Sequence, residues 1–193
     1  MNAIQTILLD MDDVLCDCTG ACLRHMGLHD WEREDYGIDT RDIYAEYRRV
    51  TGIEYSPAQF WEHFKREFWA NIETTPWCYD LIDLVGKYVP TDQIALCTSP
   101  TKCGDCLAGK LDWIESHLPK WLHRQYVMTP RKRLCAAPGH ILIDDASENT
   151  TEFFIAGGWA ITFPQQWNHC RSHIGEELEY VAGWLDAYAD GRV

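Results

Sequence analysis

Short apolar runs that alternate with segments of helical periodicity constrain the fold of this chain more than any other feature of its sequence. The apolar runs lie at 4–9, 92–100, 125–129, 140–145 and 159–163, and helical patterns lie at 19–27, 41–52, 56–69, 109–119, 147–158 and 175–188. Strands that alternate with helices are typical of a parallel sheet covered by helices on both faces. The sequence therefore predicts an α/β fold with a doubly wound parallel five-stranded sheet.

A long helical block separates the first predicted strand from the second. Within it, Ser56, Pro57 and Gln59 form a capping-box helix start, and Phe60 shares a helical face with later phenylalanines. We predict a small helical cap over 18–75, inserted after the first strand. Residues 1–17 and 76–193 would form the α/β core domain.

The composition is that of a globular protein of 193 residues, with 46% hydrophobic residues and a formal charge of −13. This acidity argues against binding to a nucleic-acid duplex but leaves room for a small phosphorylated substrate. No run reaches the roughly 18 apolar residues of a membrane span, and the first acids come too early for a secretory signal peptide. We therefore expect a cytoplasmic protein.

Nine cysteines are numerous for such a chain, and without a signal peptide we expect reduced thiols. Two clusters invite a metal-binding interpretation: Cys16, Cys18 and Cys22 with His25, and Cys103 with Cys106. The first has C-x-C-x3-C spacing, which does not match the pairs of a zinc knuckle, and the second is a lone C-x2-C pair. Buried or half-buried thiols are the favoured interpretation.

Polar residues follow the predicted strands at the points where those strands end. They are Asp10, Asp12, Thr98, Ser99, Asp144 and Asp145. In an open parallel sheet, ligands bind outside the carboxyl ends of the strands. Two acidic pairs at this edge can hold one hard cation, and Mg²⁺ fits because it also accepts a substrate phosphate.

Such a site permits phosphoryl transfer. One carboxylate can attack phosphorus and form an aspartyl-phosphate, and a second carboxylate two residues later can move a proton. Crowding by other acids would raise the pKa of the second carboxyl group, as that role requires. Nearby lysines and hydroxyls would neutralise the transferring group. Asp13 and Asp17 are interpreted as surface or capping residues.

Four motifs occur in the order found in the haloacid dehalogenase (HAD) superfamily of phosphotransferases. They are D-x-D-x-V at 10–14, the strand "IALCTS", a lysine at Lys132, and "HILIDD" ending at Asp144 and Asp145. Within that superfamily the chain resembles the 5'(3')-deoxyribonucleotidases, through "TSP" at 98–100, "MT" before Lys132, "LIDD" and an aromatic cap. The resemblance covers about 1–165 and implies a HAD-like Rossmannoid fold.

The resemblance also implies roles in catalysis. Asp10 would be the nucleophile and a Mg²⁺ ligand. Asp12 would be the acid/base and would bind Mg²⁺ through its backbone carbonyl. Asp145 would be the direct carboxylate ligand of the second pair, with Asp144 alongside it or behind it.

For the phosphate, the resemblance implies Thr98, Ser99, Lys132 and, at the start of the following helix, Lys110. Lys102 and Arg131 are alternatives to Lys132, because the spacing from Lys132 to the acidic pair is about two residues longer than in the relatives. Where the relatives often have arginine after the acidic pair, this chain has Ala146.

Phe60 and Trp61 fall where the relatives stack the base, although the stripe they belong to is equally compatible with a cap core. His169 is expected on the surface. The predicted function is a Mg²⁺-dependent phosphatase for (deoxy)nucleoside monophosphates. The alternatives are a phosphatase for another small metabolite, such as a sugar phosphate, and a non-catalytic regulator that binds Mg²⁺ or nucleotides. A homodimer is compatible with the sequence, which does not define base, sugar or 5' versus 3' preference.

Overall fold

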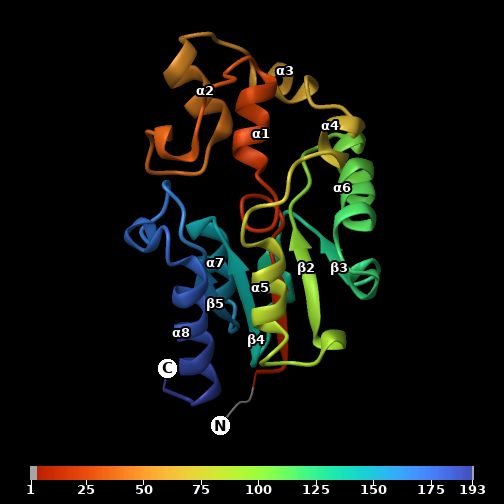
Figure 1. Ribbon diagram of the computed structural model, residues 1–193, viewed down its shortest axis with the longest axis vertical. Coiled ribbons are helices and arrows are strands. Elements are labelled where there is room, and N and C mark those ends of the chain that lie inside the picture. The colour runs from red at the N-terminus through yellow and green to blue at the C-terminus, as the bar shows by residue number, and fades with distance from the viewer. Residues whose placement is uncertain (1–3, 193) are drawn as a thin grey trace.

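The computed structural model describes residues 4–192, and its centre is one five-stranded sheet (Figure 1). The strands are β1 (Thr6–Leu9), β2 (Ile94–Thr98), β3 (Tyr126–Met128), β4 (His140–Asp144) and β5 (Trp159–Thr162). All neighbouring pairs are parallel, in the order β3-β2-β1-β4-β5. The predicted doubly wound parallel sheet is confirmed.

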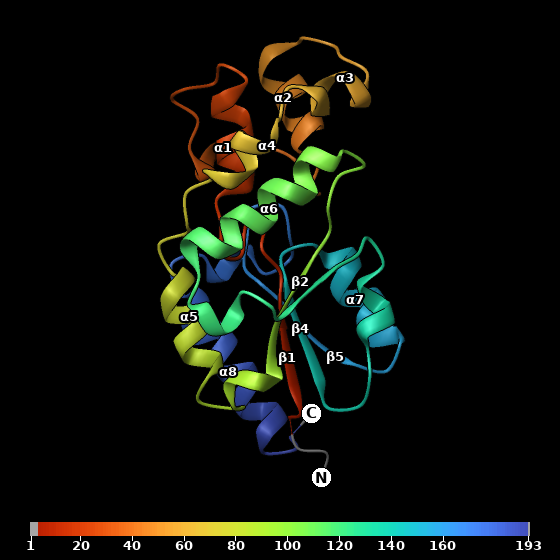
Figure 2. The same ribbon diagram turned by 90° about the vertical axis from the view of Figure 1, so that its right-hand side faces the viewer.

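Helices surround this sheet. They are α1 (Cys18–His25), α2 (Ile43–Thr51), α3 (Pro57–Glu62), α4 (Arg66–Ala70), α5 (Cys78–Val85), α6 (Gly104–His117), α7 (Ser147–Ile155) and α8 (Glu177–Ala189). Short 3₁₀ helices are η1 (Arg33–Asp35), η2 (Thr91–Gln93), η3 (Lys120–Leu122), η4 (Lys132–Cys135) and η5 (Arg171–His173). Helices α5 and α8 cover one face of the sheet and α7 covers the other (Figure 2).

Strand β1 lies at the centre of the sheet and is buried on both faces. Ile7 and Leu9 have no exposed surface, and Leu8, which points to the opposite face, is 4% exposed. A continuous apolar run without alternation is typical of such a strand. Because β1 pairs with both β2 and β4, the residues that follow these three strands meet at one edge of the sheet.

Helices α1 to α4 gather at one end of the molecule, beyond the carboxyl ends of the strands (Figure 1). We call residues 18–75 the cap segment; its separation from the core as a domain stays a prediction. Asp17 caps α1 by accepting a hydrogen bond from the Gly20 N–H, as its capping interpretation required. Helix α2 begins after the cap residue Asp42 and ends at Gly52, whose φ is 69°.

The helix predicted over 56–69 is broken in two. The capping box of Ser56 and Gln59 starts α3 as predicted, but the chain is extended at Lys65 (φ −87°, ψ 171°) before α4 begins. The break turns Trp69 back over Phe64, whose carbonyl accepts a hydrogen bond from the Trp69 indole N–H. Burial of aromatic surface on both short helices thus outweighs local helix continuity.

Three helix predictions need correction. Helix α5 was not predicted, although Cys78, Leu81, Ile82 and Val85 carry a helical pattern and are buried. Helix α6 begins at Gly104, five residues before the predicted start, and α8 begins two residues later than predicted. The earlier start of α6 places Lys110 within the helix rather than at its beginning.

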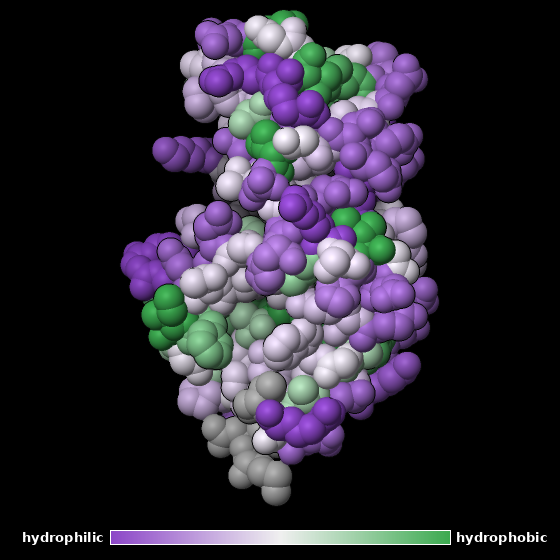
Figure 3. Space-filling model, turned by 90° about the vertical axis from the view of Figure 1, so that its left-hand side faces the viewer, coloured by the Kyte–Doolittle hydropathy of each residue, from purple (hydrophilic) through white to green (hydrophobic). Residues whose placement is uncertain are grey.

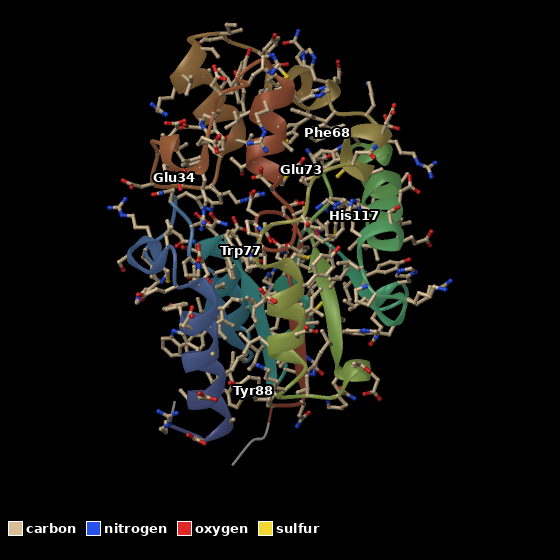
Figure 4. All side chains as sticks on the ribbon, viewed as in Figure 1. Glu34, Phe68, Glu73, Trp77, Tyr88 and His117 are labelled. Carbon is tan, nitrogen blue, oxygen red and sulfur yellow. The ribbon has the colours of Figure 1, made fainter. Side chains whose placement is uncertain are left out.

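The cap segment packs directly on the core through α4 and α6. A β-carbon at Gly109 would lie 2.5 Å from the Arg66 carbonyl oxygen and from the Trp69 β-carbon, so only glycine allows this close crossing. Trp77, labelled near the junction of cap and sheet in Figure 4, donates its indole N–H to the Val14 carbonyl. The cap therefore lies against the residues that follow β1.

The face of the molecule in Figure 3 is mostly polar and shows hydrophobic residues only as small separate patches. Phe154 is 64% exposed on the outer side of α7, although its neighbour Phe153 is buried. Among residues 4–192, no helix combines the length and the apolar character that a bilayer crossing requires.

Candidate active site

Acidic side chains from two neighbouring strands converge at the carboxyl edge of the sheet. Carboxylate oxygens of Asp10, Asp144 and Asp145 all lie within 4.8 Å of one another, and all three residues are buried. The Asp10 N–H donates to the Ile143 carbonyl at 2.9 Å, which holds the end of β1 against β4. The sheet thus brings together acids that are more than 130 positions apart in sequence.

Lys132 compensates part of this negative charge. Its Nζ lies 2.7 Å from Oδ1 of Asp10 and 2.6 Å from Oδ2 of Asp144, and its side chain is 1% exposed. Asp144 also accepts hydrogen bonds from the Asn149 amide and the Ala146 N–H. Both oxygens of Asp144 therefore have protein partners. Lys102 and Arg131, the alternatives to Lys132, are exposed.

Lys110 occupies the other side of the site. From the middle of α6, its Nζ lies 2.7 Å from Oδ2 of Asp12 and 2.7 Å from the Thr98 hydroxyl oxygen. Lys110 is 1% exposed, and its ammonium lies 6.0 Å from the centre of the Trp69 ring in the cap segment. The Ser99 hydroxyl instead donates to the Thr129 carbonyl at 3.1 Å.

Asp145 is held by two residues that sequence reasoning missed. Its Oδ2 lies 2.8 Å from Nε of Arg41 and accepts a hydrogen bond from the Trp167 indole at 2.8 Å. The Asp145 Oδ1 atom is buried and has no hydrogen-bond partner among the described residues. Nothing in the sequence links Arg41 or Trp167 to the acidic pair, because both reach it only through the tertiary fold.

Asp13 is buried rather than on the surface, which corrects one part of its interpretation. Its carboxylate caps the start of α1 by accepting hydrogen bonds from the Thr19 N–H and hydroxyl, both at 2.7 Å. Arg41 lies 2.8 Å from the same carboxylate. Arg41 therefore bridges Asp13 and Asp145.

The two carboxyl groups of the D-x-D motif differ in pKa. Burial raises the pKa of Asp10 to about 6, against the attraction of Lys132. Burial acts on Asp12 too, but Lys110 and Arg41 outweigh it and lower the pKa of that group. The prediction that crowding raises the pKa of Asp12 is thus wrong for this state, because the attraction of the ammonium of Lys110, 2.7 Å away, and of Arg41 outweighs burial.

The predicted base-stacking residues lie in the aromatic interior of the cap segment. Phe60 has no exposed surface and packs against Tyr44, Tyr47 and Phe64. This burial contradicts the prediction that Phe60 contacts substrate. Trp61 is partly exposed and stacks on Trp69, the ring that lies near Lys110. His169 is exposed, as expected.

The cysteines are free thiols. Cys16, Cys18 and Cys22 are buried, and their neighbour His25 packs against Phe64 and Phe68. Within residues 4–192, the cluster of Asp10, Asp144 and Asp145 is the group that could hold a metal, and no cysteine belongs to it. The interpretation as buried thiols agrees with this arrangement.

The donor set suits a hard divalent cation. The cluster offers carboxylate oxygens without sulfur or imidazole, which is the chemistry that Mg²⁺ prefers. An unpartnered buried oxygen is costly, and the Asp145 Oδ1 atom is such an atom at the cluster. The residues present therefore fit a bound Mg²⁺.

The fold and the site together define a class. A five-stranded parallel sheet with D-x-D after β1, a hydroxyl after β2, a lysine before β4 and an acidic pair at its end is the arrangement of the HAD-like hydrolases. The HAD-hydrolase YfnB from Bacillus subtilis, in a crystal structure bound to magnesium, has the same fold. It is 14% identical, with a TM-score of 0.54 over 95% of this chain and 99% of that chain.

The family follows from the sequence match. The model of the family "5' nucleotidase, deoxy (Pyrimidine), cytosolic type C protein" matches residues 2–190, so the chain belongs to that family. The mitochondrial 5'(3')-deoxyribonucleotidase of Mus musculus is 28% identical over 75% of this chain and 66% of its own length. The cytosolic type of Homo sapiens is 26% identical over 72% of this chain and 69% of its own. The chain thus spans about two thirds of the length of these curated relatives.

Proposed function

We propose that the protein is a Mg²⁺-dependent phosphatase that hydrolyses deoxynucleoside monophosphates through an aspartyl-phosphate on Asp10. The observation that carries this proposal is the placement of Asp10. Its Oδ1 forms an ion pair with Lys132 and accepts a hydrogen bond from the Met11 N–H. Its Oδ2 accepts no hydrogen bond from residues 4–192. A carboxylate that is held by one oxygen and free at the other can act as a nucleophile.

Asp10, Asp145 and the backbone carbonyl of Asp12 would hold Mg²⁺, which when bound neutralises charge on the phosphoryl oxygens. Asp145 offers its free Oδ1 atom, whereas Asp144 has both oxygens engaged and instead holds Lys132. We therefore assign Asp145 as a direct ligand. Asp144 would act by fixing the lysine beside the nucleophile.

The phosphoryl group would lie between the two lysines. Thr98, Ser99 and Lys110 surround one side of the expected position and Lys132 the other. In the first step Oδ2 of Asp10 forms a bond to phosphorus, while the bond to the nucleoside oxygen breaks and Asp12 gives that oxygen a proton. In the second step Asp12 takes a proton from water, whose oxygen attacks phosphorus and releases Asp10 and inorganic phosphate.

Substrate binding would raise the pKa of Asp12 by changing its contact with Lys110. In the present state Lys110 holds the pKa of Asp12 low. A phosphate that binds Lys110 and Thr98 draws the ammonium away from Asp12, and the pKa of Asp12 then rises. The proton donor would thus be prepared by the substrate itself.

The preference for a nucleotide rests on the family match, because Phe60 lies inside the cap and only Trp61 remains as a candidate base contact. Stacking on one aromatic ring contributes on the order of 1–3 kcal/mol and tolerates several bases.

Free thiols agree with a reducing, cytosolic compartment.

The test is a phosphate-release assay over deoxynucleotides, ribonucleotides and sugar phosphates, with Mg²⁺ or with EDTA. We expect deoxynucleoside monophosphates to rank first, EDTA to abolish turnover, and Asp10→Asn to lower kcat by on the order of 10³-fold or more. Asp112→Asn, which changes a partly exposed acid on α6 whose partner is the exposed Arg66, is the matched control and keeps activity. Equal rates on sugar phosphates would overturn the nucleotidase assignment, and an active Asp10→Asn enzyme would overturn the mechanism.

A further inference from the structure

Arg41 belongs to the cap segment but ends at the acidic edge of the core. It precedes α2, and its guanidinium lies 2.8 Å from Asp13 and 2.8 Å from Asp145. The two acids come from different places in the core, one after β1 and one after β4. Arg41 is therefore a link between the cap segment and the expected ligands of the metal.

The backbone at Asp13 adopts a conformation that most residues avoid. Asp13 has φ +60°, a left-handed conformation that favours glycine. Such strain in a non-glycine residue persists where the surrounding structure or the function requires that side chain. Here the side chain caps α1 and binds Arg41.

The charges around Arg41 are unevenly balanced. Counted at their formal charges, the carboxylates of Asp10, Asp12, Asp13, Asp144 and Asp145 face three cations, Lys110, Lys132 and Arg41. Without Arg41 the cluster carries three net negative charges. A divalent cation reduces this to one, and a phosphate dianion bound beside the cation restores three.

We propose that Arg41 is a positioning residue that closes the cap segment over the site, and that the net charge of the bound ligands sets how tightly it does so. The inference rests on the proposed function, because it assumes that Mg²⁺ and a phosphate group bind at this edge. It adds an assignment of Arg41 and an order of events: the cap loosens when the cation binds and closes again when phosphate joins it.

The physical basis is competition for Asp145. Arg41 binds Oδ2 of Asp145, and the unpartnered Oδ1 of the same carboxylate is the atom offered to the cation. Two cations on one carboxylate repel each other, so each weakens the binding of the other. Because linkage is reciprocal, the factor by which Mg²⁺ loosens Arg41 equals the factor by which Arg41 weakens Mg²⁺. A phosphate dianion bound beside the metal attracts both Mg²⁺ and Arg41 and so offsets the repulsion between them.

Two other arginines join the cap segment to the core without an ion pair to this cluster. Arg171 lies 2.8 Å from Asp39, two positions before Arg41, in an exposed ion pair. Arg33 binds Glu177, Gln165 and the Pro164 carbonyl and lies over the Trp77 ring. The exposed pair of Arg171 and Asp39 should not respond to charge at the metal site, so Arg171→Met is a matched control for Arg41→Met.

The experiment measures amide hydrogen exchange over residues 36–46 in protein without metal, with Mg²⁺, and with Mg²⁺ and inorganic phosphate. The N–H groups of Gly37, Asp42 and Ala45 form hydrogen bonds within this stretch and report its opening. Mg²⁺ affinity is measured in parallel by isothermal titration calorimetry. We expect Mg²⁺ to speed exchange on the order of tenfold, and phosphate to reverse the change.

The variants separate charge from structure. Arg171→Met keeps the wild-type response, whereas Arg41→Met exchanges rapidly in all three states and binds Mg²⁺ on the order of tenfold more tightly. In Arg41→Lys, Mg²⁺ should speed hydrogen exchange by a smaller factor than in the wild type. Lysine keeps the positive charge but lacks the planar guanidinium that contacts both Asp13 and Asp145. If Arg41→Met does not fold, Asp13→Asn serves in its place: it removes one of the two negative partners of Arg41, so exchange over 36–46 should rise, while the loss of a negative charge should weaken Mg²⁺ binding.

Two results overturn the inference alone: a wild type that binds Mg²⁺ and releases phosphate from nucleotides but shows no change in exchange, or an Arg41→Met variant that keeps the wild-type response. A wild type that shows no binding of Mg²⁺ by calorimetry would instead overturn the proposed metal chemistry, and this inference with it.

Discussion

The two halves of the site are built in different ways. On the core side, the adjacent strands β1 and β4 place Asp10 and Asp144 at their carboxyl ends. Lys132, in η4, forms ion pairs with both carboxylates. On the cap side, Asp13 and Asp145 depend on Arg41, which comes from the cap segment. The difference teaches that the sheet places the acids and Lys132 of the site, whereas the cap segment adds a positive charge that balances part of the acidity.

Loss of Lys132 tests the core half and should have the largest effect. Lys132→Met leaves Asp10 and Asp144 buried without their shared cation, so we expect kcat to fall about 10²–10³-fold. The free energy of unfolding should fall by about 3–5 kcal/mol, because an uncompensated buried charge remains. Steady-state kinetics and urea unfolding measure both effects.

Lys102→Met is the control for this prediction, since Lys102 is exposed and lies outside the site. A Lys132→Met enzyme with the kcat of the wild type would show that the core half does not depend on this lysine.

Truncation of Phe60 tests whether the cap aromatics hold the cap together or bind substrate. Phe60→Ala removes a ring that has no exposed surface, and we expect a loss of about 3–5 kcal/mol in unfolding free energy. KM for a nucleotide should stay close to that of the wild type at temperatures where the variant is folded. Val50→Ala on α2, where the side chain is 43% exposed, is the control with little effect. A Phe60→Ala variant of normal stability with a raised KM would restore the base-stacking role.

The pH dependence of stability probes the nucleophile in metal-free protein. Burial raises the pKa of Asp10 from 3.8 to about 6, so the folded state binds this proton more tightly than the unfolded state. Ionised Asp10 therefore costs stability as the pH rises from about 4 to 6, by at most about 3 kcal/mol above that range. Asp10→Asn removes this cost, and Lys132 keeps Asp144 as a partner.

We expect metal-free Asp10→Asn to be the more stable protein near neutral pH, by at most the same about 3 kcal/mol, and to lose that advantage near about pH 4. Unfolding by urea in EDTA at several pH values measures the difference. An Asp10→Asn variant that is less stable than the wild type at neutral pH would mean that the Lys132 ion pair dominates over burial.

The sequence by itself determined the sheet and the residues at its carboxyl edge. Apolar runs that end in Asp10, Thr98 and Asp144 are local signals, and parallel pairing necessarily brings their ends to one edge. The spacing of Lys132 left its assignment open, yet η4 places it between two carboxylates. The buried residues of α5, Cys78, Leu81, Ile82 and Val85, also follow a helical spacing that is visible in the sequence.

The tertiary structure alone decided how the cap segment meets this edge. Whether Phe60 faces the substrate or the cap interior depends on the break at Lys65, which is stabilised by aromatic packing between α3 and α4. The approach of Arg41 to Asp145 and the low pKa of Asp12 depend on contacts between residues far apart in the chain. Periodicity and motifs report local structure, and such contacts leave no local signal because their energy arises only when the whole chain has folded.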